Sequence, residues 1–357
     1  MEVFNHNFTR QQILRRIGHL SQIAGIKSYT FNSGQAKNVN ALDVKTGSGL
    51  YFTVIPDRAL DIAWLEYKGI PLAYFSKTGI RNPHFFIPRD HEWLRSFFGG
   101  MLTTCGLTQV GIPGEDGRWH LNLHGRISNT PAENYSISEE WENDNLILTI
   151  RGQIRESVIT GENLLLSRQI TTQGGKNTIV IEDTVENSGF NITPLMILYH
   201  LNIGFPLLSE HSTLYAPVAS TTPRDDYSEL HISDFEKFKK PDRDVKGQIF
   251  FHKLSSEHNG DTAVAVVNPK IGLGLRISFN LNDLPYFTQW KLLQEQDYVL
   301  GLEPGNNIPM GRNYASEKGT LEYLHPGETR HYRINLTILE TQKEIDEAIS
   351  YINSMNK

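Results

Sequence analysis

YHLNIGFP, residues 199–206, is typical of a short strand that ends at a Gly/Pro turn. By the two-residue period of a strand, Tyr199 and Leu201 lie on one face, while His200 and Asn202 lie on the other. The flanking residues continue this pattern, and a strand is expected over 194–203. The sequence therefore predicts a strand with an apolar face and a face that carries a titratable imidazole.

A second stretch, LGLEPGN at residues 300–306, repeats this arrangement about a hundred residues later. Its leucines alternate with Gly301 and Glu303, so the carboxylate points away from them. A His and a Glu aimed into one cavity can serve as general acid and base near neutral pH, because burial tunes both pKa values. We predict that His200 and Glu303 are such a pair.

Composition limits the classes of protein and of partner. The 357 residues are 39% hydrophobic, with 34 Lys and Arg against 40 Asp and Glu, giving a net charge of −6. Without a basic stripe, nucleic acid is not the expected partner, and a small neutral or polar ligand fits better. The single cysteine, Cys105, excludes an internal disulfide. No signal peptide or membrane span is recognised, so we expect a cytoplasmic protein; a homodimer is one candidate assembly.

Strand patterns dominate residues 25–340. Turn signals such as Gly174-Gly175 separate them, no linker or repeat interrupts them, and they predict an all-β chain: one large antiparallel β-sandwich domain over 1–357. Short helices are expected only near the ends, one capped by Thr9 and running through Arg16 and one over 341–352. The polar stretch 221–244 is interpreted as a loop, either a solvated insertion or a rim that closes on substrate. The expected strands span 49–64 (as two runs), 146–154, 164–171, 177–185, 194–203, 262–267, 273–279, 298–303 and 331–339.

A third polar constellation is WHLNLHGR, residues 119–126. If the strand continues through it, His120, Asn122 and His124 share one face. Two histidines on one face suggest a zinc site, but no third ligand occurs at a telling distance, and we predict no metal. Core histidines bonded to backbone groups are the alternative.

In motif order, the chain resembles the aldose 1-epimerase (galactose mutarotase) family. The motifs are Leu-His-Gly at 123–125, Tyr-His-x-Asn at 199–202 and Leu-Glu-Pro at 302–304, and they are preceded by a Gly-rich segment at 98–101. The resemblance spans about residues 45–340 and implies a galactose mutarotase-like supersandwich. It also implies that His200 is the general acid, Glu303 the general base and His124 a sugar-binding residue near the ring oxygen. No cofactor is implied.

One part of the family pattern is missing. The usual Gly-Arg-x-Ala-Asn-Arg, which supplies a substrate-binding arginine, is replaced by TTCGLT at 103–108. We expect Arg58 or Arg126 to take that role, because a guanidinium offers several donors to vicinal hydroxyls. A change at Thr104 is then expected to alter substrate binding. Further candidates for contact with the sugar, beside His124, are Trp290, for its apolar face, and Asn202, Asn306 and Arg312, for hydroxyl groups.

The resemblance predicts interconversion of the anomers of a monosaccharide by His/Glu acid–base catalysis. Glu303 would take the proton of the C1 hydroxyl while His200 protonates the ring oxygen, with roles reversed on closure. Two alternatives stay open. One is a non-catalytic carbohydrate-binding or regulatory module. The other is an epimerase of an anionic sugar at another carbon, which clustering of Lys291, Arg58 and Arg126 would favour.

Overall fold

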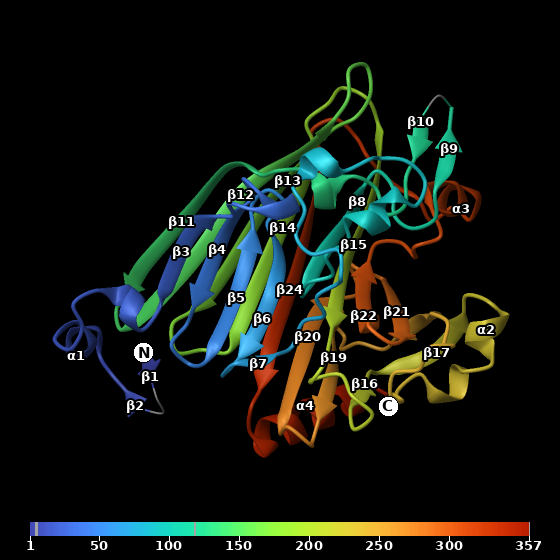
Figure 1. Ribbon diagram of the computed structural model, residues 1–357. Coiled ribbons are helices and arrows are strands. Elements are labelled where there is room, and N and C mark those ends of the chain that lie inside the picture. The colour runs from blue at the N-terminus through green and yellow to red at the C-terminus, as the bar shows by residue number, and fades with distance from the viewer. Residues whose placement is uncertain (4–5, 118, 357) are drawn as a thin grey trace.

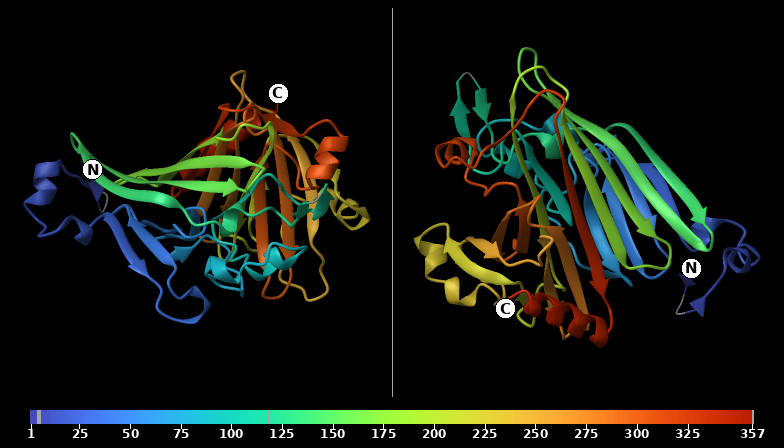
Figure 2. Two further views of the ribbon diagram at one scale, coloured as in Figure 1. Left: turned by 90° about the horizontal axis from the view of Figure 1, so that it is seen from above. Right: turned by 180° about the vertical axis from the view of Figure 1, so that it is seen from behind.

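A computed structural model of the protein describes residues 1–3, 6–117 and 119–356. The prediction of a large antiparallel all-β fold is confirmed, since the described strands pair antiparallel in two extended layers. One layer is an eight-stranded sheet in the order β11-β12-β13-β14-β24-β20-β19-β16 (Figures 1 and 2). Its strands are β11 (Glu133–Glu142), β12 (Asn145–Ser157), β13 (Asn163–Gln173), β14 (Thr178–Asn187), β24 (Thr329–Leu339), β20 (Leu273–Asn280), β19 (Asp261–Asn268) and β16 (Thr213–Tyr215).

The facing layer consists of two sheets. A bridge between Ala73 and Ile203 links the N-terminal sheet to β15, and Figure 1 shows the N-terminal sheet, in blue, beside the strands around β15. The five-stranded N-terminal sheet contains β3 (Gly25–Thr30), β4 (Asn40–Lys45), β5 (Leu50–Ile55), β6 (Asp61–Tyr67) and β7 (Ile70–Pro71). The second sheet contains β17 (Val218–Pro223), β18 (Gln248–Leu254), β21 (Tyr286–Leu293), β22 (Tyr298–Gly305), β15 (Thr193–Ile203) and β23 (Glu322–Leu324), with β8 (Leu102–Leu107) also paired to β15.

Alternation of apolar and polar residues explains how the layers pack. In β13 every second residue is buried, including Leu164, Leu166 and Ile170, and these side chains join one core cluster between the layers. Burial of each such side chain contributes about 1.5–3 kcal/mol, which favours this register over a one-residue slip. The main core therefore lies between the eight-stranded sheet and the layer that faces it.

β15 differs because it is buried on both faces. Its Tyr199 face belongs to the main core, as predicted, while Met196 and Leu198 on the other face pack in a second apolar cluster. β8 and β22 flank the strand. A polar side chain on the second face, such as His200, is therefore held in a desolvated place by rigid neighbours.

The terminal helices follow their predicted caps. Thr9 and Thr341 each form a capping box, the first before a shorter helix than expected. The loop expected over 221–244 is only partly one, since it holds the end of β17 and two short helices. The helices are α1 (Arg10–Leu14), α2 (Asp226–Glu229), α3 (Arg312–Glu317) and α4 (Gln342–Ser354), with 3₁₀ turns η1 (Leu20–Gln22), η2 (Gly34–Ala36), η3 (Pro83–Phe85), η4 (Glu92–Arg95), η5 (Ile127–Asn129) and η6 (Ile232–Asp234).

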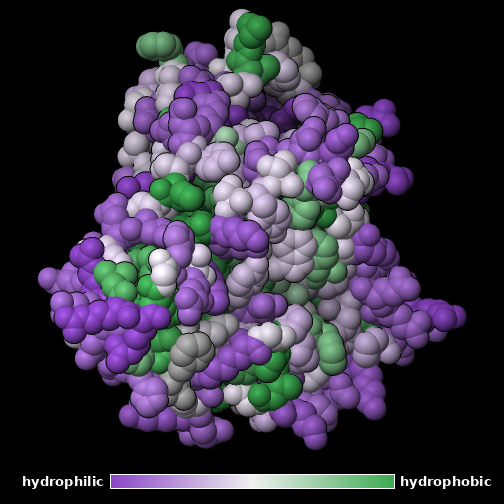
Figure 3. Space-filling model, turned by 60° about the vertical axis from the view of Figure 1, so that its left-hand side comes forward, coloured by the Kyte–Doolittle hydropathy of each residue, from purple (hydrophilic) through white to green (hydrophobic). Residues whose placement is uncertain are grey.

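Two hairpins complete the described elements: β1 (Glu2–Val3) with β2 (His6–Asn7), and β9 (Gly114–Asp116) with β10 (Trp119–Leu121). Among the described residues, no helix is long and apolar enough to cross a membrane. On the face shown in Figure 3, hydrophilic side chains cover most of the surface and hydrophobic ones form separate patches. That face therefore offers no broad apolar surface for another chain.

Candidate active site

The two titratable groups predicted from the sequence meet on adjacent strands. β15 and β22 pair with Leu201 opposite Leu302, which brings His200 beside Glu303 on the other face. His200 Nε2 lies 3.1 Å from Glu303 Oε1, and the side chains are 6% and 2% exposed. Gly301 permits this approach, because a Cβ there would lie 2.8 Å from Glu303 Oε1. The strand register therefore builds a buried imidazole–carboxyl pair.

Aromatic rings surround His200. Its ring centroid lies 5.3 Å from that of Phe97, 5.5 Å from that of Trp290 and 5.8 Å from that of His124. Trp93 in turn lies 4.8 Å from His124. These rings exclude water from the pair and leave it in a low-dielectric environment.

Burial favours the neutral form of both members of the pair. It raises the pKa of Glu303 from 4.5 to about 8 and lowers the pKa of His200 from 6.5 to about 4, the latter against weaker interactions with Asn202 and with its own backbone, which raise it. Between these values the pair holds one titratable proton, which these shifts place on Glu303 and which the 3.1 Å contact can pass to His200 Nε2. One acid and one base are then available together across the neutral range.

His124 reaches the same site from a turn, not from a strand. β10 ends at Leu121, so the prediction that His120, Asn122 and His124 share a strand face is wrong. His124 has φ 57°, and the following Gly125 packs so closely on Gly106 that a Cβ would lie 2.3 Å from the Gly106 carbonyl oxygen. Burial, and then the charge of His200, lowers the pKa of His124 to about 3, which keeps it neutral.

A pocket of about 280 Å³ opens over these residues. Several buried polar atoms at it have no hydrogen-bond partner within the protein: Nδ1 of His124, Nδ1 of His200 and Oγ1 of Thr288. Because unpaired buried polar groups are costly, these atoms mark where a ligand would bind. The remaining wall also includes Gly111 and the polar side chains of His91 and Arg224, and it is otherwise apolar, with Trp93, Leu94, Phe97, Ile112, Leu123, Ile249, Trp290 and Pro309.

The expectation that Arg58 or Arg126 enters the pocket is wrong. The Arg58 side chain is fully buried elsewhere, where it donates to the carbonyl oxygens of Ser128, Arg81 and Ser96 and lies over the Phe98 ring. These three bonds engage Nε, Nη1 and Nη2, so the guanidinium is held away from the pocket. Arg126 is exposed and lines a separate cavity, because the chain turns at Gly125 instead of continuing as a strand.

Arg312 lies in that separate cavity too, paired with Asp116 at 3.1 Å. Lys291 lies outside the pocket as well, with its ammonium donating to the Asp234 carbonyl oxygen at 2.9 Å. The cluster of Lys291, Arg58 and Arg126 that would favour an anionic substrate is therefore not formed.

The two asparagines expected to bind hydroxyl groups hold the backbone instead. Asn202 donates to the carbonyl oxygens of Gly100 and His200, at 3.0 and 2.8 Å. Asn306 accepts from the Ile197 amide at 2.7 Å and donates to the Leu195 carbonyl oxygen at 3.0 Å. Neither lines the pocket. Both fix the ends of β15 and so position the residues that do.

Several pocket residues were not predicted from the sequence. Thr288 stands across from Glu303 on β21, and Arg224 reaches the pocket from the stretch 221–244. Arg224 donates from Nε and Nη2 to the carboxylate of Asp225, at 3.0 and 2.7 Å. The alternation in β21 placed Thr288 on the face of Trp290, so that residue could have been found. Arg224 lies in the stretch 221–244, for which a rim closing on substrate was one interpretation, but no pattern singled this residue out.

No group of three or more His, Cys, Asp or Glu that could hold a metal ion occurs among the described residues. His120, the other histidine considered for zinc, contacts the carboxylates of Glu115 and Asp90 at 2.5 and 3.1 Å, away from His124. Both acids raise the pKa of His120, the hydrogen bond to Glu115 most. Its surroundings are those of a surface ion pair.

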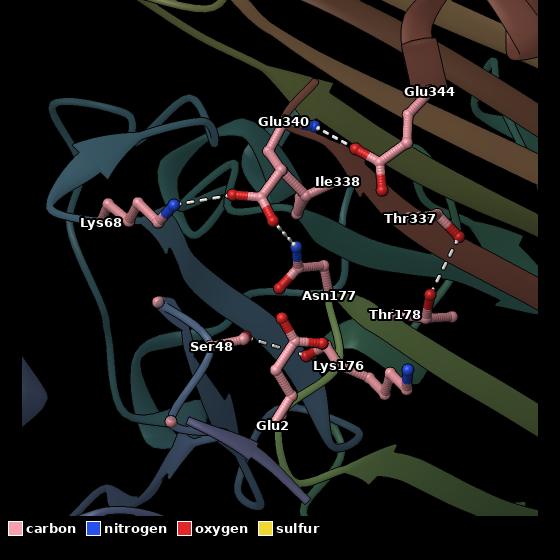
Figure 4. A pocket seen from close by; sticks show the side chains of 13 residues that line it. Glu2, Ser48, Lys68, Lys176, Asn177, Thr178, Thr337, Ile338, Glu340 and Glu344 are labelled. Atoms are coloured by element: carbon pink, nitrogen blue, oxygen red, sulfur yellow. Dashed lines mark hydrogen bonds and ion pairs between the residues drawn. The ribbon is translucent and has the colours of Figure 1, made fainter. Parts of the chain in front are cut away.

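A larger cavity, about 480 Å³, lies between the layers near the start of the chain (Figure 4). Its polar side chains bind mostly one another: Lys68 pairs with Glu340 at 2.7 Å, and Asn177 donates to Glu340 at 3.3 Å. Ser48 donates to the Lys176 carbonyl oxygen at 3.0 Å. The polar groups of this cavity therefore join the sheets to one another, whereas the pocket over His200 has polar atoms without partners.

The model of one protein family matches residues 36–338, and that family is described as a domain of unknown function, DUF4432. The chain belongs to the DUF4432 family. No curated protein matches this DUF4432 chain.

Solved structures share its fold. A "putative aldose 1-epimerase" from Klebsiella pneumoniae is 24% identical and superposes with a TM-score of 0.89 over 93% of this chain and 88% of that one. A galactose mutarotase-like protein from Clostridium acetobutylicum is 13% identical, with a TM-score of 0.61 over 90% and 100%. A galactose 1-epimerase from Lactobacillus acidophilus is 11% identical, with a TM-score of 0.58 over 89% and 100%. The DUF4432 chain thus has the galactose mutarotase-like fold, as predicted.

Proposed function

We propose that the protein is an aldose 1-epimerase that interconverts the anomers of a monosaccharide. The observation that carries this proposal is the buried His200–Glu303 pair, which holds one proton at the floor of a pocket with unpartnered polar atoms. The fold shared with proteins described as epimerases is consistent with it. An isolated acid–base pair of this kind needs no cofactor for the reaction that follows.

Mutarotation moves one proton between two oxygens on the same carbon. Removal of the C1 hydroxyl proton and protonation of the ring oxygen open the ring; C1 then rotates, and the reverse transfers close the ring. Neighbouring groups 3.1 Å apart can serve both oxygens because those oxygens share C1. The assignment from family resemblance, in which Glu303 takes the hydroxyl proton and His200 delivers one to the ring oxygen, requires that the shared proton first pass from Glu303 to His200; with the proton left on Glu303, the two residues exchange roles.

The remaining pocket groups would hold the ring. His124 stays neutral and has an unpartnered Nδ1 that can bond a sugar oxygen. Thr288 offers a hydroxyl, and Trp290 offers a ring to the apolar C–H face of a pyranose. The donors of the usual family arginine are missing from the pocket floor, so binding relies on shape and on these few groups.

The test is the rate at which freshly dissolved single anomers of several aldoses relax, followed by polarimetry or proton NMR. Wild-type protein should accelerate relaxation of at least one sugar, and Glu303→Gln should lower that acceleration by about 10²-fold or more. Glu66→Gln, a carboxylate change on β6 away from the pocket, is the matched control and should keep the rate. No acceleration of any sugar, or full activity in Glu303→Gln, would refute the proposal and favour a binding module.

A further inference from the structure

Building on the proposed function, we infer that the substrate is a 6-deoxy sugar, with a methyl group where an ordinary hexose carries a hydroxymethyl group. The pocket has a polar end and an apolar end. His200 and Glu303 lie 5% and 2% exposed at its floor, whereas Leu94 and Ile112 at its mouth are 51% and 44% exposed. The reacting carbon C1 must sit at the floor, so the far side of the ring meets the mouth.

Beyond the floor, the polar side chains that line the pocket are His91 and Arg224, and both are exposed at its rim. With His200 and Glu303 engaged at C1 and the ring oxygen, the unpartnered buried side-chain atoms that remain are His124 Nδ1 and Thr288 Oγ1. Both lie near the floor: Thr288 pairs with Glu303 across the strands, and the His124 and His200 ring centroids are 5.8 Å apart. The buried partners that this pocket offers to sugar hydroxyl groups are therefore few, and they lie close to C1.

The pocket wall at Ile112 is apolar. Ile112 follows Gly111, whose carbonyl oxygen is taken by the His124 amide at 3.0 Å, and its own carbonyl oxygen is taken by Gln109 at 2.6 Å. Both carbonyl oxygens are therefore taken, and Ile112 lines the pocket. Against the Ile112 side chain, a hydroxymethyl group finds no partner for its hydroxyl, while a methyl group gains apolar contact.

An anionic group on the substrate fits less well. Arg224 is the cation among the described pocket-lining residues, and its Nε and Nη2 both donate to Asp225. Asp225 in turn caps α2 by accepting from the Ser228 amide. The charge at the rim is thus already compensated, and it sets no strong preference for a carboxylate or phosphate.

The experiment compares matched sugars that differ only at C6: 6-deoxygalactose with galactose, and 6-deoxyglucose with glucose, each in both enantiomers, with the corresponding uronic acids as a third arm. Anomer exchange is measured by NMR and binding by calorimetry. We expect kcat/KM for the preferred 6-deoxy sugar to exceed that of its parent by about 10- to 100-fold, the range that one hydroxyl in an apolar pocket produces.

A variant pair locates the effect. Ile112→Asn supplies a partner at the mouth and should reduce the preference for the 6-deoxy sugar at least about threefold, mostly by improving the parent hexose. Ile159→Asn, at a position 88% exposed and outside the pocket, should leave the preference unchanged. Equal effects of the two variants would overturn the inference.

The outcomes separate this inference from the proposed function. Activity that is equal on both members of each pair, or higher on hexoses or uronic acids, overturns the inference and leaves the epimerase standing. If no sugar is epimerised, the proposed function fails, and calorimetry then decides the inference: tighter binding of the 6-deoxy member supports it, and equal, weaker or absent binding overturns it.

Discussion

The two faces of β15 differ in whether their polar side chains are fully paired. On one face, Tyr199 donates to Asp183 at 2.7 Å, and Arg168 binds Asp183 and Asp61 at 2.6 and 2.9 Å. On the other face, one residue along the strand, His200 contacts Glu303 but leaves Nδ1 without a partner. We call the first face, whose polar groups are paired with one another, the closed face. The second face, which keeps an unpaired ring nitrogen, is called the open face.

This difference separates stability from function. In the network of the first face, called here the Arg168 network, the guanidinium binds two carboxylates that would otherwise be buried charges. Burial lowers the pKa of Arg168, but Asp183 and Asp61 outweigh it and raise that pKa. Burial likewise raises the pKa of Asp61 to about 6, against Arg168 and Thr104, which lower it. Paired groups hold the sheets together, whereas unpaired ones are available to a ligand.

The largest expected effect is on the open face. Glu303→Gln and His200→Asn should each lower kcat/KM by about 10²–10⁴-fold, because each removes one proton-transfer group from the same step. The double variant should be no more than about tenfold worse than the poorer single variant. Polarimetric relaxation of the best substrate measures all four proteins. Fully multiplicative losses would show that the two residues act independently.

The closed face should instead control folding. Arg168→Met removes the cation between two buried carboxylates and should lower the free energy of unfolding by about 3–5 kcal/mol. The same change at exposed Arg151, which bonds Gln169, should cost less than about 1 kcal/mol. Urea denaturation measures both free energies of unfolding. Each variant should keep the wild-type activity per folded molecule. A small effect at Arg168 would mean that the network contributes little to stability.

The comparison also predicts a pH dependence. Activity should form a plateau between about pH 4 and pH 8, since below it the pair gains a second proton and above it the pair loses its last one. Stability follows the same groups. Glu303 has a folded pKa above its unfolded value of 4.5, so its contribution is present below pH 4.5 and is lost as pH rises to about 8.

Glu303→Gln removes the loss of folding stability that Glu303 causes as the pH rises. Relative to wild type, the variant should gain stability between pH 5 and 8 with a slope of at most about 1.4 kcal/mol per pH unit. His200 has the opposite sign: its depressed pKa makes its contribution present above pH 6.5 and lost as pH falls to about 4. Denaturation midpoints across this range test both signs. Parallel pH curves for wild type and Glu303→Gln would contradict the raised pKa of Glu303.

The smallest effect concerns Thr104, where the expected influence on substrate binding is replaced by one on stability. Thr104 Oγ1 donates to Asp61 at 2.6 Å in the Arg168 network, and its side chain does not line the pocket. Thr104→Ala should cost about 1–2 kcal/mol in unfolding free energy and leave KM unchanged. The control is Thr30→Ala, at an exposed residue bonded to Asn40, which should lower the free energy of unfolding by less than about 0.5 kcal/mol. A raised KM in Thr104→Ala would place it near the substrate after all.

The local sequence pattern predicted side-chain direction correctly where a strand continued without a break. Alternation around His200 and Glu303 set which side of each strand faced the core, and Thr9 and Thr341 marked the starts of helices. The same pattern failed at 122–126, where a tight turn through His124 and Gly125 ends the strand. His124 nevertheless lines the pocket, and its role in binding sugar stays a prediction from the family resemblance.

The sequence by itself determined the strands, their faces and the residue types able to transfer a proton, because side-chain direction in a strand repeats every two residues. The tertiary structure alone decided which arginines and asparagines reach the pocket. Arg58 is held by three carbonyl oxygens, while Arg224 arrives from a distant loop. A long side chain binds whichever groups the fold leaves without partners, and that balance depends on contacts between segments far apart in the chain.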